Sequence, residues 1–578
     1  MGETFPPPGV MWLVRGRANP QGAAGAEVYL VRGDATAGPV AEIRPAAGVE
    51  LPARRPSAVE ARLTLLHFND LHGRLGVFGR IAGRLADARR AAAADERRAV
   101  LAITTGDERS GAPADLLSDE GTHPAYRLYS EAGVDLGVPG NHDLDLGARR
   151  LAHAIGRAAR FPLLAANVIG AAALAEHLHP AALFVVKGVR VGFIGLTTPA
   201  QVRPDGESGR RVTDPLAAAH NLIPALRPLC DVLIVVSHLG LSLSQHSAIV
   251  EGAGDVELAR SLPPGAVHLI IGGHTHSALN EGGLSPEHIV NGIPIVQAGK
   301  FGQFVGEVAL CAGETVEVTH ARLRATIDLP DDEAFTQAHV RPLLTRIEAE
   351  SRRVLGCVAE DADLSAEAVR ERLAGGESAL ANFIADALVA RSRAAGYPVD
   401  FAMIDATSVN AGLRPGGALT LGEWFEVMPF DDVVCLLSLS GRQIEALLRD
   451  NALRIERPGE PHTQRGFLHF SAGVRYAIRL GRTRAEAEVS DITLNGQPAA
   501  ACYERTFVVA TTSFVRGPAA AWEAHVGAHL GRPLFDLKSV PREHTNLGVR
   551  DLLLEHIAAH GGVLPAAGAR RDGRLVTR

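Results

Sequence analysis

The chain has little cysteine, with five residues among 578, and no two of them form a Cys-x-x-Cys pair. A disulfide framework and a thiolate metal site are therefore not expected. Long apolar runs are missing as well. Segments such as Val232–Val236 are far shorter than the ~20 apolar residues of a membrane-spanning helix, so no membrane span is expected.

Neither a secretion signal nor an N-myristoylation pattern is expected at the N-terminus. It reads Met-Gly-Glu-Thr-Phe-Pro-Pro-Pro, without the basic and then apolar segments of a secretion signal. Pro6 stands where N-myristoylation requires Ser or Thr. These absences predict a cytoplasmic location.

A strong excess of charge is also absent. The formal net charge is -7, which gives no general attraction to polymeric nucleic acid, so nucleic acid is not expected as a partner. The hydrophobic content of 46% is ordinary for a globular protein. Because 578 residues are too many for one core, two large domains are expected.

Residues 1–60 are rich in Pro, Gly and Ala and contain two short strand-like pieces, Trp12–Gly16 and Tyr29–Gly33. Both pieces contain Leu-Val-Arg-Gly, but two copies do not establish a repeat architecture. We interpret the segment as a loosely attached N-terminal extension of unknown role.

Short β-rich runs alternate with Ala-, Arg- and Leu-rich helical stretches over residues 61–328, a pattern typical of an α/β layered domain. Apolar residues at helical spacing predict a linker helix within residues 329–357. A second mixed α/β domain is expected over residues 358–578. The expected strands are Leu63–Phe68, Val100–Thr104, Val191–Leu196, Val232–Ser237, His268–Ile271, Ile293–Val296, Phe401–Ile404, Val433–Leu439 and Thr506–Ala510, and the expected helices include Gly79–Ala94 and Ala379–Arg391.

Five polar clusters share one context, because each follows an apolar strand. In layered α/β folds, the loops that leave the carboxyl ends of strands gather at one edge of the sheet, so the clusters are expected to converge. They are Asp70-Leu71-His72, Gly106-Asp107, Gly140-Asn141-His142-Asp143-Leu144-Asp145, Ser237-His238-Leu239-Gly240 and Gly272-Gly273-His274-Thr275-His276.

The side chains in these clusters are typical metal ligands. Alternate residues of an extended segment face the same way, so Asp70 and His72 are expected to point at one ion, as are His274 and His276. Imidazole combined with carboxylate and amide oxygens fits two transition-metal ions such as Zn, Mn, Co or Fe. Two ions about 3.5–4 Å apart clamp an attacking hydroxide and a phosphoryl group.

Each cluster also has a simpler explanation. Asn, Asp and Gly favour turns, so Gly140-Asn141-His142-Asp143 alone could be a turn, and a single His or Asp after a strand is usually a cap or loop residue. Five clusters in the same strand-to-loop context are hard to explain as separate turns. The sequence therefore favours a metal centre.

The clusters resemble the five blocks of the calcineurin-like metallophosphoesterases, the first block being Leu65-Leu66-His67-Phe68-Asn69-Asp70-Leu71-His72-Gly73. The branch that is most similar is the bacterial 5'-nucleotidase / UDP-sugar hydrolase / 2',3'-cyclic phosphodiesterase family, whose members are commonly exported. The resemblance implies a four-layer α/β/β/α sandwich, followed by a mixed α/β domain of the 5'-nucleotidase C-terminal type. It also implies a small-molecule phosphate ester, a nucleotide above all, as the substrate.

The resemblance implies a role for each matching residue. His142 and Asp145 match a His-Asp dyad, in which the imidazole faces the phosphate and the carboxylate orients it, while a metal-bridging hydroxide attacks phosphorus. One ion would be held by Asp70, His72, Asp107 and His276, and the other by Asp107, Asn141, His238 and His274, with Asp107 bridging.

The second domain matches the family with departures. Glu377–Ala387 resembles its opening helix, and Phe430 and Phe514 match the aromatic pair that stacks on the base. Asn410 stands where the family has a substrate-gripping Arg, with Arg414 nearby, and Asp405 replaces an Asn. An Asn lacks the fixed charge and the bidentate geometry of Arg. The segment Arg516–Trp522 also lacks the Asp that reaches the ribose.

These departures leave alternatives open. Phe430 and Phe514 could be ordinary core aromatics. The metal centre could act on another ester, as a cyclic nucleotide phosphodiesterase, a nucleotide-sugar hydrolase or a thiosulfohydrolase-like enzyme. A third hypothesis is a non-catalytic metal-binding protein with an altered second domain.

Overall fold

The structure is a computed structural model, and it divides into two compact units. The first runs to Ile347, apart from Gly111–Pro113, and the second begins at Glu348. The residues that the structure describes are 9–54, 60–120, 124–200, 202, 208–246, 250–360, 363–430, 432–457, 459, 466–515, 534–563 and 568–578.

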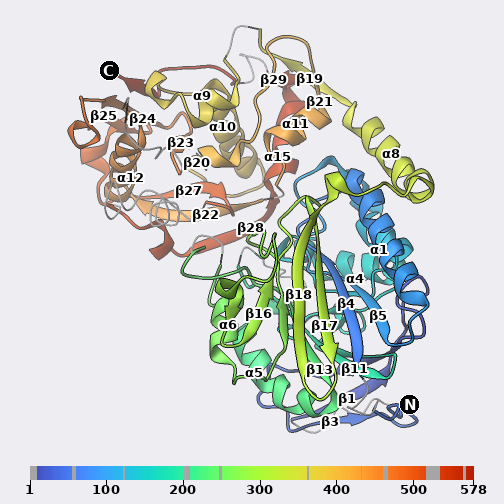
Figure 1. Ribbon diagram of the computed structural model, residues 1–578. Helices are drawn as coiled ribbons and strands as arrows, with labels where there is room; N and C mark the ends of the chain where they lie inside the picture. The colour runs from blue at the N-terminus through green and yellow to red at the C-terminus, as the bar shows by residue number, and fades with distance from the viewer. Residues whose placement is uncertain are drawn as a thin grey trace. The chain divides into compact units, whose positions relative to one another are not determined.

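Two sheets form the centre of the first unit (Figure 1). One has the strand order β15 (Ile289–Val290), β16 (Ile293–Val296), β14 (Leu269–Ile271), β13 (Val232–His238), β11 (Val189–Thr197), β10 (Ala181–Val186), β2 (Glu27–Arg32), β1 (Val10–Arg15) and β3 (Glu42–Pro45). The other has the order β18 (Val316–Ala325), β17 (Phe304–Ala312), β4 (Ala61–Phe68), β5 (Arg98–Thr104), β6 (Leu136–Gly137), β7 (Leu163–Leu164) and β9 (Leu178–His179). A small pair, β8 (Val168–Ile169) and β12 (Arg211–Val212), lies apart from both.

The two sheets pack face to face because both faces of their central strands are apolar. In β13, Ile234 contributes to the core between the sheets, while Val235 faces the outer core of the nine-stranded sheet. In β5, Leu101 contributes to the core between the sheets, and Ala102 faces the outer core of the seven-stranded sheet. Successive side chains of a strand point to opposite faces, so a continuous apolar run is needed at these positions.

Helices cover the outer face of each sheet. The outer core of the seven-stranded sheet contains side chains of α1 (Phe78–Ala93), α2 (Pro124–Ala132) and α4 (Ala148–Ala158), and α1 lies along β4 and β5 in Figure 1. The outer core of the nine-stranded sheet contains side chains of α5 (Pro215–Leu226) and α6 (Asp255–Ser261). The unit is therefore the four-layer α/β/β/α sandwich that the sequence resemblance implies.

Parallel pairing sets the direction of the strands near the centre of both sheets. Strands β4, β5, β6, β7 and β9 run parallel to one another, as do β11, β13, β14 and β16. The carboxyl ends within each sheet therefore lie at one edge. Four of the five polar clusters follow such an end, as predicted, and the fourth in chain order begins with the last two residues of β13, Ser237 and His238.

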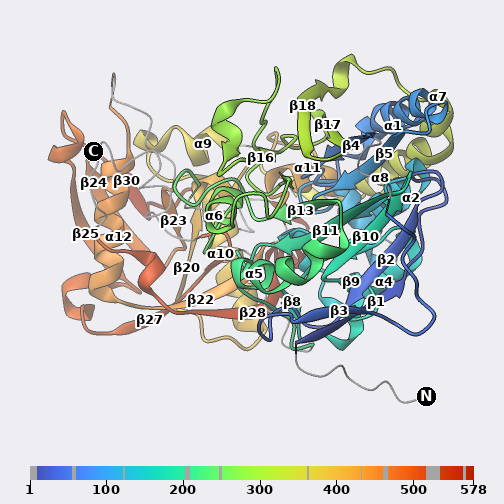
Figure 2. The same cartoon turned by 60° about the horizontal axis from the view of Figure 1, so that its bottom comes forward.

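The expectation of a loosely attached N-terminal extension is wrong. Strand β2 pairs with β10, and β1 pairs with both β2 and β3, so the segment completes one side of the nine-stranded sheet (Figure 2). Leu13, Tyr29 and Val31 are at most 1% exposed and belong to its outer core. The alternation of apolar residues in both Leu-Val-Arg pieces is that of a half-buried strand pair.

The predicted linker region is helical over most of its length. It contains α7 (Glu333–Phe335) and α8 (Arg341–Ser351), and then enters β19 (Val354–Val358). Phe335, Val340 and Ile347 pack on the outer core of the seven-stranded sheet, so the apolar spacing reflects contact with the first unit.

The second unit is built on one apolar core around three sheets. Within the described residues, no helix has both the length and the apolar composition needed to cross a bilayer. The sheets are β23 (Leu468–Phe470), β20 (Phe401–Asp405), β27 (Thr506–Thr512), β22 (Val433–Ser440) and β28 (Arg542–Gly548); β21 (Ala418–Thr420), β19 and β29 (Gly562–Val563); and β26 (Gln497–Pro498), β25 (Glu488–Leu494), β24 (Val474–Arg479) and β30 (Leu575–Thr577). The helices are α9 (Ala366–Arg370), α10 (Ala379–Ala394), α11 (Leu421–Val427), α12 (Gly441–Arg454) and α15 (Val549–His560).

The buried N-terminal strands give a stability prediction. We expect Leu13→Ala to lower the free energy of unfolding by about 2–5 kcal/mol, because it leaves a cavity in a packed core. Leu344→Ala is the matched control, since Leu344 is 39% exposed, and should change stability by no more than about 0.5 kcal/mol. Denaturant unfolding of metal-free protein, followed by circular dichroism, measures both. Equal effects would place β1 outside the folded core.

Candidate metal centre

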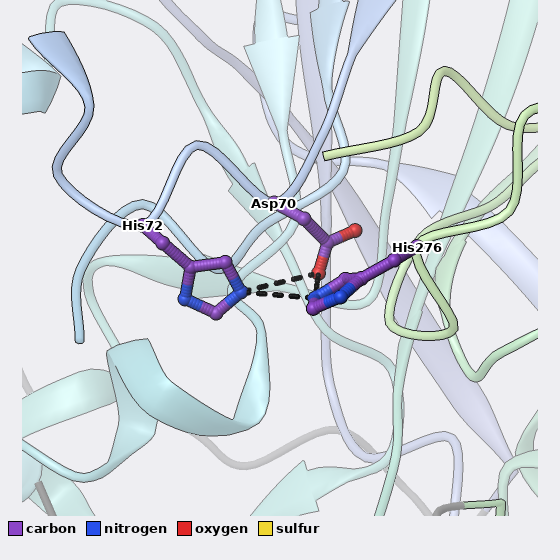
Figure 3. A group of neighbouring side chains, drawn as sticks. All are labelled: Asp70, His72 and His276. Atoms are coloured by element: carbon purple, nitrogen blue, oxygen red, sulfur yellow. Dashed lines mark hydrogen bonds and ion pairs between the residues drawn. The ribbon is translucent and has the colours of Figure 1, made fainter. Parts of the chain in front are cut away.

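One group of possible metal ligands consists of Asp70, His72 and His276. Each offers one ligand atom, and these atoms all lie within 4.8 Å of one another. Asp70 Oδ1 is 3.4 Å from His276 Nε2 and 3.8 Å from His72 Nε2. Figure 3 shows both imidazoles pointing toward this carboxylate, His72 from the loop after β4 and His276 from the loop after β14. The loops after β4 and β14 therefore meet, as the clusters predicted.

A second group consists of Asp107, His238 and His274, again with ligand atoms within 4.8 Å of one another. Asp107 Oδ2 lies 3.1 Å from His238 Nε2 and 3.9 Å from His72 Nε2, which belongs to the first group. The carboxylate thus stands between the two groups. This is the position that a bridging ligand requires.

Several ligand atoms at this centre are buried without a hydrogen-bond partner among the described residues. They are Asp70 Oδ1 and both polar side-chain atoms of the fully buried Asn141. A buried polar group without a partner is costly, and a cation is the natural partner for carboxylate, amide and imidazole lone pairs. The residues present therefore fit a pair of divalent ions.

The histidines are oriented by backbone carbonyls. His238 Nδ1 donates to Thr105 O at 2.5 Å, and His72 Nδ1 donates to Ser110 O at 2.6 Å. Each bond places the ring proton on Nδ1 and leaves the Nε2 lone pair facing the site. Metal-binding histidines are commonly oriented in this way.

Asp70 and His72 belong to one ligand group, as predicted, but the backbone there is not extended, so strand alternation is not the cause. The prediction that His274 and His276 point at one ion is wrong, because they fall in different groups. Asp70 has φ +52° and His72 +46°, with Asp107 at +56°. His274 and His276 have φ +75° and +57°. Left-handed conformations are unfavourable for residues with a side chain and cluster at functional sites. The side chains converge because the loops turn sharply after each strand.

Asp143 ties two of these loops together, a role that the motif analysis missed. Its carboxylate accepts hydrogen bonds from the backbone N–H groups of Asp107 (2.9 Å), Glu108 (3.1 Å) and Gly140 (2.8 Å). Asn141 follows Gly140 directly, so Asp143 positions the backbone at two candidate ligands. The signal was its place in the Gly-Asn-His-Asp cluster.

Glycine allows the same two loops to touch. A Cβ on Gly106 would overlap the backbone nitrogen of Gly140, and a Cβ on Gly140 would overlap the Asp107 carboxylate. Gly106 also has φ +90°, which favours glycine. Backbone therefore lies against backbone behind the Asp107 carboxylate.

Burial and neighbouring charges shift the pKa values of the carboxylates and imidazoles at the centre. Burial raises the pKa of Asp70, but His276 and His238 outweigh it and lower that pKa to about 2. Burial likewise opposes ionisation of Asp107, yet His238 and His142 hold its pKa well below the usual range. Burial lowers the pKa of His72 to about 4. These groups are thus poised as carboxylates and, for His72, as a neutral imidazole, the forms that bind metals.

The predicted dyad is formed beside the centre. His142 Nδ1 lies 3.3 Å from Asp145 Oδ2, and the His142 ring centroid lies 5.5 Å from that of His72. The His142 backbone N–H donates to Asp107 Oδ1 at 3.0 Å, and Arg109 Nη1 donates to the His142 carbonyl at 3.3 Å. The His142 side chain is 18% exposed, whereas that of Asp145 is 3% exposed. An imidazole held in this way remains accessible to a ligand.

The candidate base-stacking residues lie in the second unit. Phe430 precedes β22 and Phe514 follows β27, and these strands pair antiparallel, with Ser513 N–H donating to Val433 O at 2.8 Å. Both aromatics therefore lie near the same end of the sheet. Phe514 is 40% exposed, which an ordinary core aromatic is not.

The two other predicted substrate residues, Asn410 and Arg414, are both exposed. The Asn410 backbone N–H donates to Val427 O at 2.9 Å, which ties its loop to the end of α11. The Arg516–Trp522 segment, in which an expected Asp is missing, lies outside the described residues.

Asp405 has internal partners that the sequence did not reveal. Its carboxylate accepts from both the N–H and Oγ1 of Thr407 at 2.7 Å. Arg454 is fully buried, and burial lowers its pKa to about 10 against the opposing effect of Asp405 and Asp450. The negative charge that replaces an Asn is thus balanced inside the unit by a guanidinium.

The hydrogen bonds to Asp143 predict that this residue strengthens metal binding. We expect Asp143→Asn to weaken metal binding by about 10–100-fold, because its amide N–H₂ would face backbone N–H groups. Asp135→Asn is the matched control: that buried carboxylate accepts from Ala102 N and Ala23 N at the amino end of β6. Isothermal titration with Mn²⁺ measures both variants. Equal affinities in the two variants would contradict a positioning role for Asp143.

Known proteins match the chain over both units. The sequence model described as calcineurin-like phosphoesterase matches residues 63–278, and the one described as 5'-nucleotidase, C-terminal domain, matches residues 355–523. The 5'-nucleotidase of Vibrio cholerae serotype O1 is 26% identical over 479 residues, which cover 75% of this chain and 81% of that protein.

Two solved structures share the fold. A putative 5'-nucleotidase from Staphylococcus aureus has a TM-score of 0.66 at 17% identity, covering 89% of this chain and 100% of that one. A 5'-nucleotidase precursor from Thermus thermophilus has a TM-score of 0.53 at 24% identity, covering 89% and 99%. With both sequence models matched in order, the chain belongs to the calcineurin-like metallophosphoesterases of the 5'-nucleotidase family, which are hydrolases of phosphate esters.

Proposed function

We propose that the chain hydrolyses a phosphate monoester with the help of two divalent ions, and that the substrate is a 5'-nucleotide. The observation that carries the proposal is that two buried ligand groups, Asp70 Oδ1 and the Asn141 amide, have no hydrogen-bond partner among the described residues. The Asp107 carboxylate stands between two groups of potential ligands, 3.1 Å from His238 Nε2 and 3.9 Å from His72 Nε2.

The proposed ligands are Asp70, His72, Asp107 and His276 for one ion, and Asp107, Asn141, His238 and His274 for the other. Bound there, a pair of divalent ions supplies nucleophile activation and charge neutralisation for phosphoryl transfer. The donor set contains four imidazoles, which favours Zn, Mn, Co or Fe over Mg or Ca. Asp107 also accepts from the His142 backbone N–H, so the same carboxylate positions the dyad.

His142 is proposed to donate a proton to the leaving oxygen and to stabilise charge on the phosphoryl group. Asp145 accepts from Nδ1 and thereby turns Nε2 toward the substrate. Its nearly buried carboxylate also favours the protonated imidazole.

The second unit is proposed to bind the base of the nucleotide. Phe430 and Phe514 lie near the same sheet end, and the ring of Phe514 is accessible for stacking. Asn410 and Arg414 are proposed as polar contacts on exposed loops of the same unit. The name of the Vibrio cholerae relative supports a nucleotide as substrate.

A substrate panel tests the proposal directly. Protein stripped of metal by a chelator should hydrolyse nothing, and Mn²⁺, Zn²⁺ or Co²⁺ should restore cleavage of a nucleoside 5'-monophosphate, measured as released phosphate. A cyclic nucleotide, a nucleotide sugar and a thiosulfate ester complete the panel. Asp107→Asn should abolish turnover because it alters the shared ligand. Bound metal without cleavage of any ester would favour a non-catalytic protein.

The dyad predicts that the loss of kcat on removing His142 depends on the leaving group of the substrate. We expect His142→Ala to lower kcat by about 10²–10⁴-fold on a nucleotide, because the departing alkoxide needs a proton. The loss should be smaller on 4-nitrophenyl phosphate, whose leaving group is stable as an anion. His153→Ala, at an exposed histidine of α4, is the control. Equal losses on both substrates, with both metals retained, would refute proton donation by His142.

A further inference from the structure

Two buried guanidiniums lie against the backbone of the dyad segment, His142–Asp145. Arg109 Nη1 donates to the carbonyl of His142 at 3.3 Å, and Arg210 Nη1 donates to the carbonyl of Leu144. Arg109 is 6% exposed and Arg210 is 7% exposed, although arginine is seldom buried in proteins. Taking such a charge out of water is costly, so the placement of two of them at one short segment calls for an explanation.

Arg109 connects His142 to a proposed metal ligand. The Arg109 carbonyl lies 3.1 Å from His72 Nδ1, while the Arg109 side chain bonds to the His142 carbonyl. The other backbone group of His142, its N–H, donates to Asp107 Oδ1 at 3.0 Å. Asp107 and Arg109 therefore hold both backbone groups of His142, and the dyad imidazole is fixed relative to the proposed ligands.

Arg210 acts on the other partner of the dyad. Asp145 lies in a turn that closes where the Gly147 N–H donates to the Leu144 carbonyl at 3.0 Å, and Gly147 has φ +79°. Because Arg210 donates to the same carbonyl, it fixes this turn. Asp145 Oδ2 lies 3.3 Å from His142 Nδ1 and accepts from it, so the position of the turn sets the direction of the imidazole.

The small pair β8 and β12, which belongs to neither large sheet, brings Arg210 to this position. Arg210 directly precedes β12, which pairs antiparallel with β8. The fully buried Asn167, just before β8, accepts from the Thr213 N–H at 2.8 Å and donates through Nδ2 to the Thr197 carbonyl at 2.7 Å. Thr197 is the last residue of β11 in the nine-stranded sheet. The pair is thus fastened to a rigid strand and delivers a buried cation to the dyad.

Direct contact of either guanidinium with the substrate is the competing explanation. Both Nη1 atoms bond to main-chain carbonyls, and neither arginine is more than 7% exposed. The His142 side chain, by contrast, is 18% exposed. The buried cations therefore act through the dyad, which is the group that remains accessible to a ligand.

We propose that Arg109 and Arg210 are positioning residues for proton donation: Arg109 holds the backbone of His142, and Arg210 holds the turn that carries Asp145. The inference rests on the proposed function, in which His142 protonates the leaving oxygen. A displacement of about 1 Å at a reacting group lowers a rate on the order of 10²-fold, so loosening either bond has a measurable effect.

The leaving group separates positioning from general damage. Arg210→Met and Arg109→Met should each lower kcat for a nucleoside 5'-monophosphate on the order of tenfold or more, with a smaller loss on 4-nitrophenyl phosphate, whose leaving group needs no proton. KM should change by less than about twofold. Arg89→Met is the matched control and should change neither rate, because Arg89 donates to the Ala132 and Gly133 carbonyls before the amino end of β6. Equal losses on both substrates, or no loss, would overturn the proposal.

A conservative exchange guards against misfolding. Arg210→Lys keeps a cationic N–H donor for the Leu144 carbonyl and should retain kcat within about threefold of the wild type. A loss in Arg210→Lys as large as that in Arg210→Met would contradict a role through this hydrogen bond. If circular dichroism shows that Arg210→Met is unfolded, Arg109→Met takes its place in the kinetic and binding comparisons.

Binding of inorganic orthophosphate to the Mn²⁺-loaded protein tests positioning without turnover. At equal Mn²⁺ content, isothermal titration should show about threefold or more weaker binding for Arg210→Met, and no further weakening when Arg210→Met is added to His142→Ala, since both act through one imidazole. Unchanged binding in the first comparison, or additive losses in the second, would overturn the proposal. If the wild type cleaves no ester, the proposed function fails, and this double-mutant comparison still decides the role of Arg210.

Discussion

Two carboxylates, Asp70 and Asp107, are buried at one edge of the first unit, and balancing their charge is the constraint on which the surrounding arrangement depends. Burial opposes ionisation of both, and histidines from other loops counter that effect. Imidazoles alone leave Asp70 Oδ1 and the Asn141 amide without partners among the described residues. A cation between the loops satisfies both requirements at once, which is why a histidine-rich donor set surrounds this pair.

The fold brings these groups together through backbone geometry. Parallel strands in both sheets deliver their loops to one edge, and the loops after β4, β5 and β14 then turn through left-handed residues that are themselves candidate ligands. The cost of these conformations is met by local hydrogen bonds, such as those from Asp107 N and Gly140 N to Asp143. Rigid strands and strained, tightly bonded loops together hold the side chains in place before any ligand arrives.

Much of the fold and of the candidate metal centre was predictable, because the signal for both is local in the sequence. An apolar run followed by Asp, Asn or His predicted both the strands and the convergence of the clusters. Both N-terminal strands were recognised as strand-like, but their attachment was missed because β2 is held by β10, far along the chain, and short strands depend on such partners. The turn at Asp70 and the role of Asp143 arise only when separate loops meet. The same is true of the Asp405 and Arg454 pair, whose members are distant in sequence.

The contact between Gly106 and Gly140 has a consequence for how this centre can diversify. With no side chain between the two loops, their spacing is set by main-chain atoms in van der Waals contact. Exchanging one ligand type for another can alter which ion is preferred, or the Lewis acidity of that ion, while the separation of the two loops stays the same. Moving the two loops apart for a larger ion would require side chains between them in place of main-chain contact, and there is no room for such side chains. Variation in the chemistry of such a centre must therefore come through ligand identity and the loops around it, at a fixed separation.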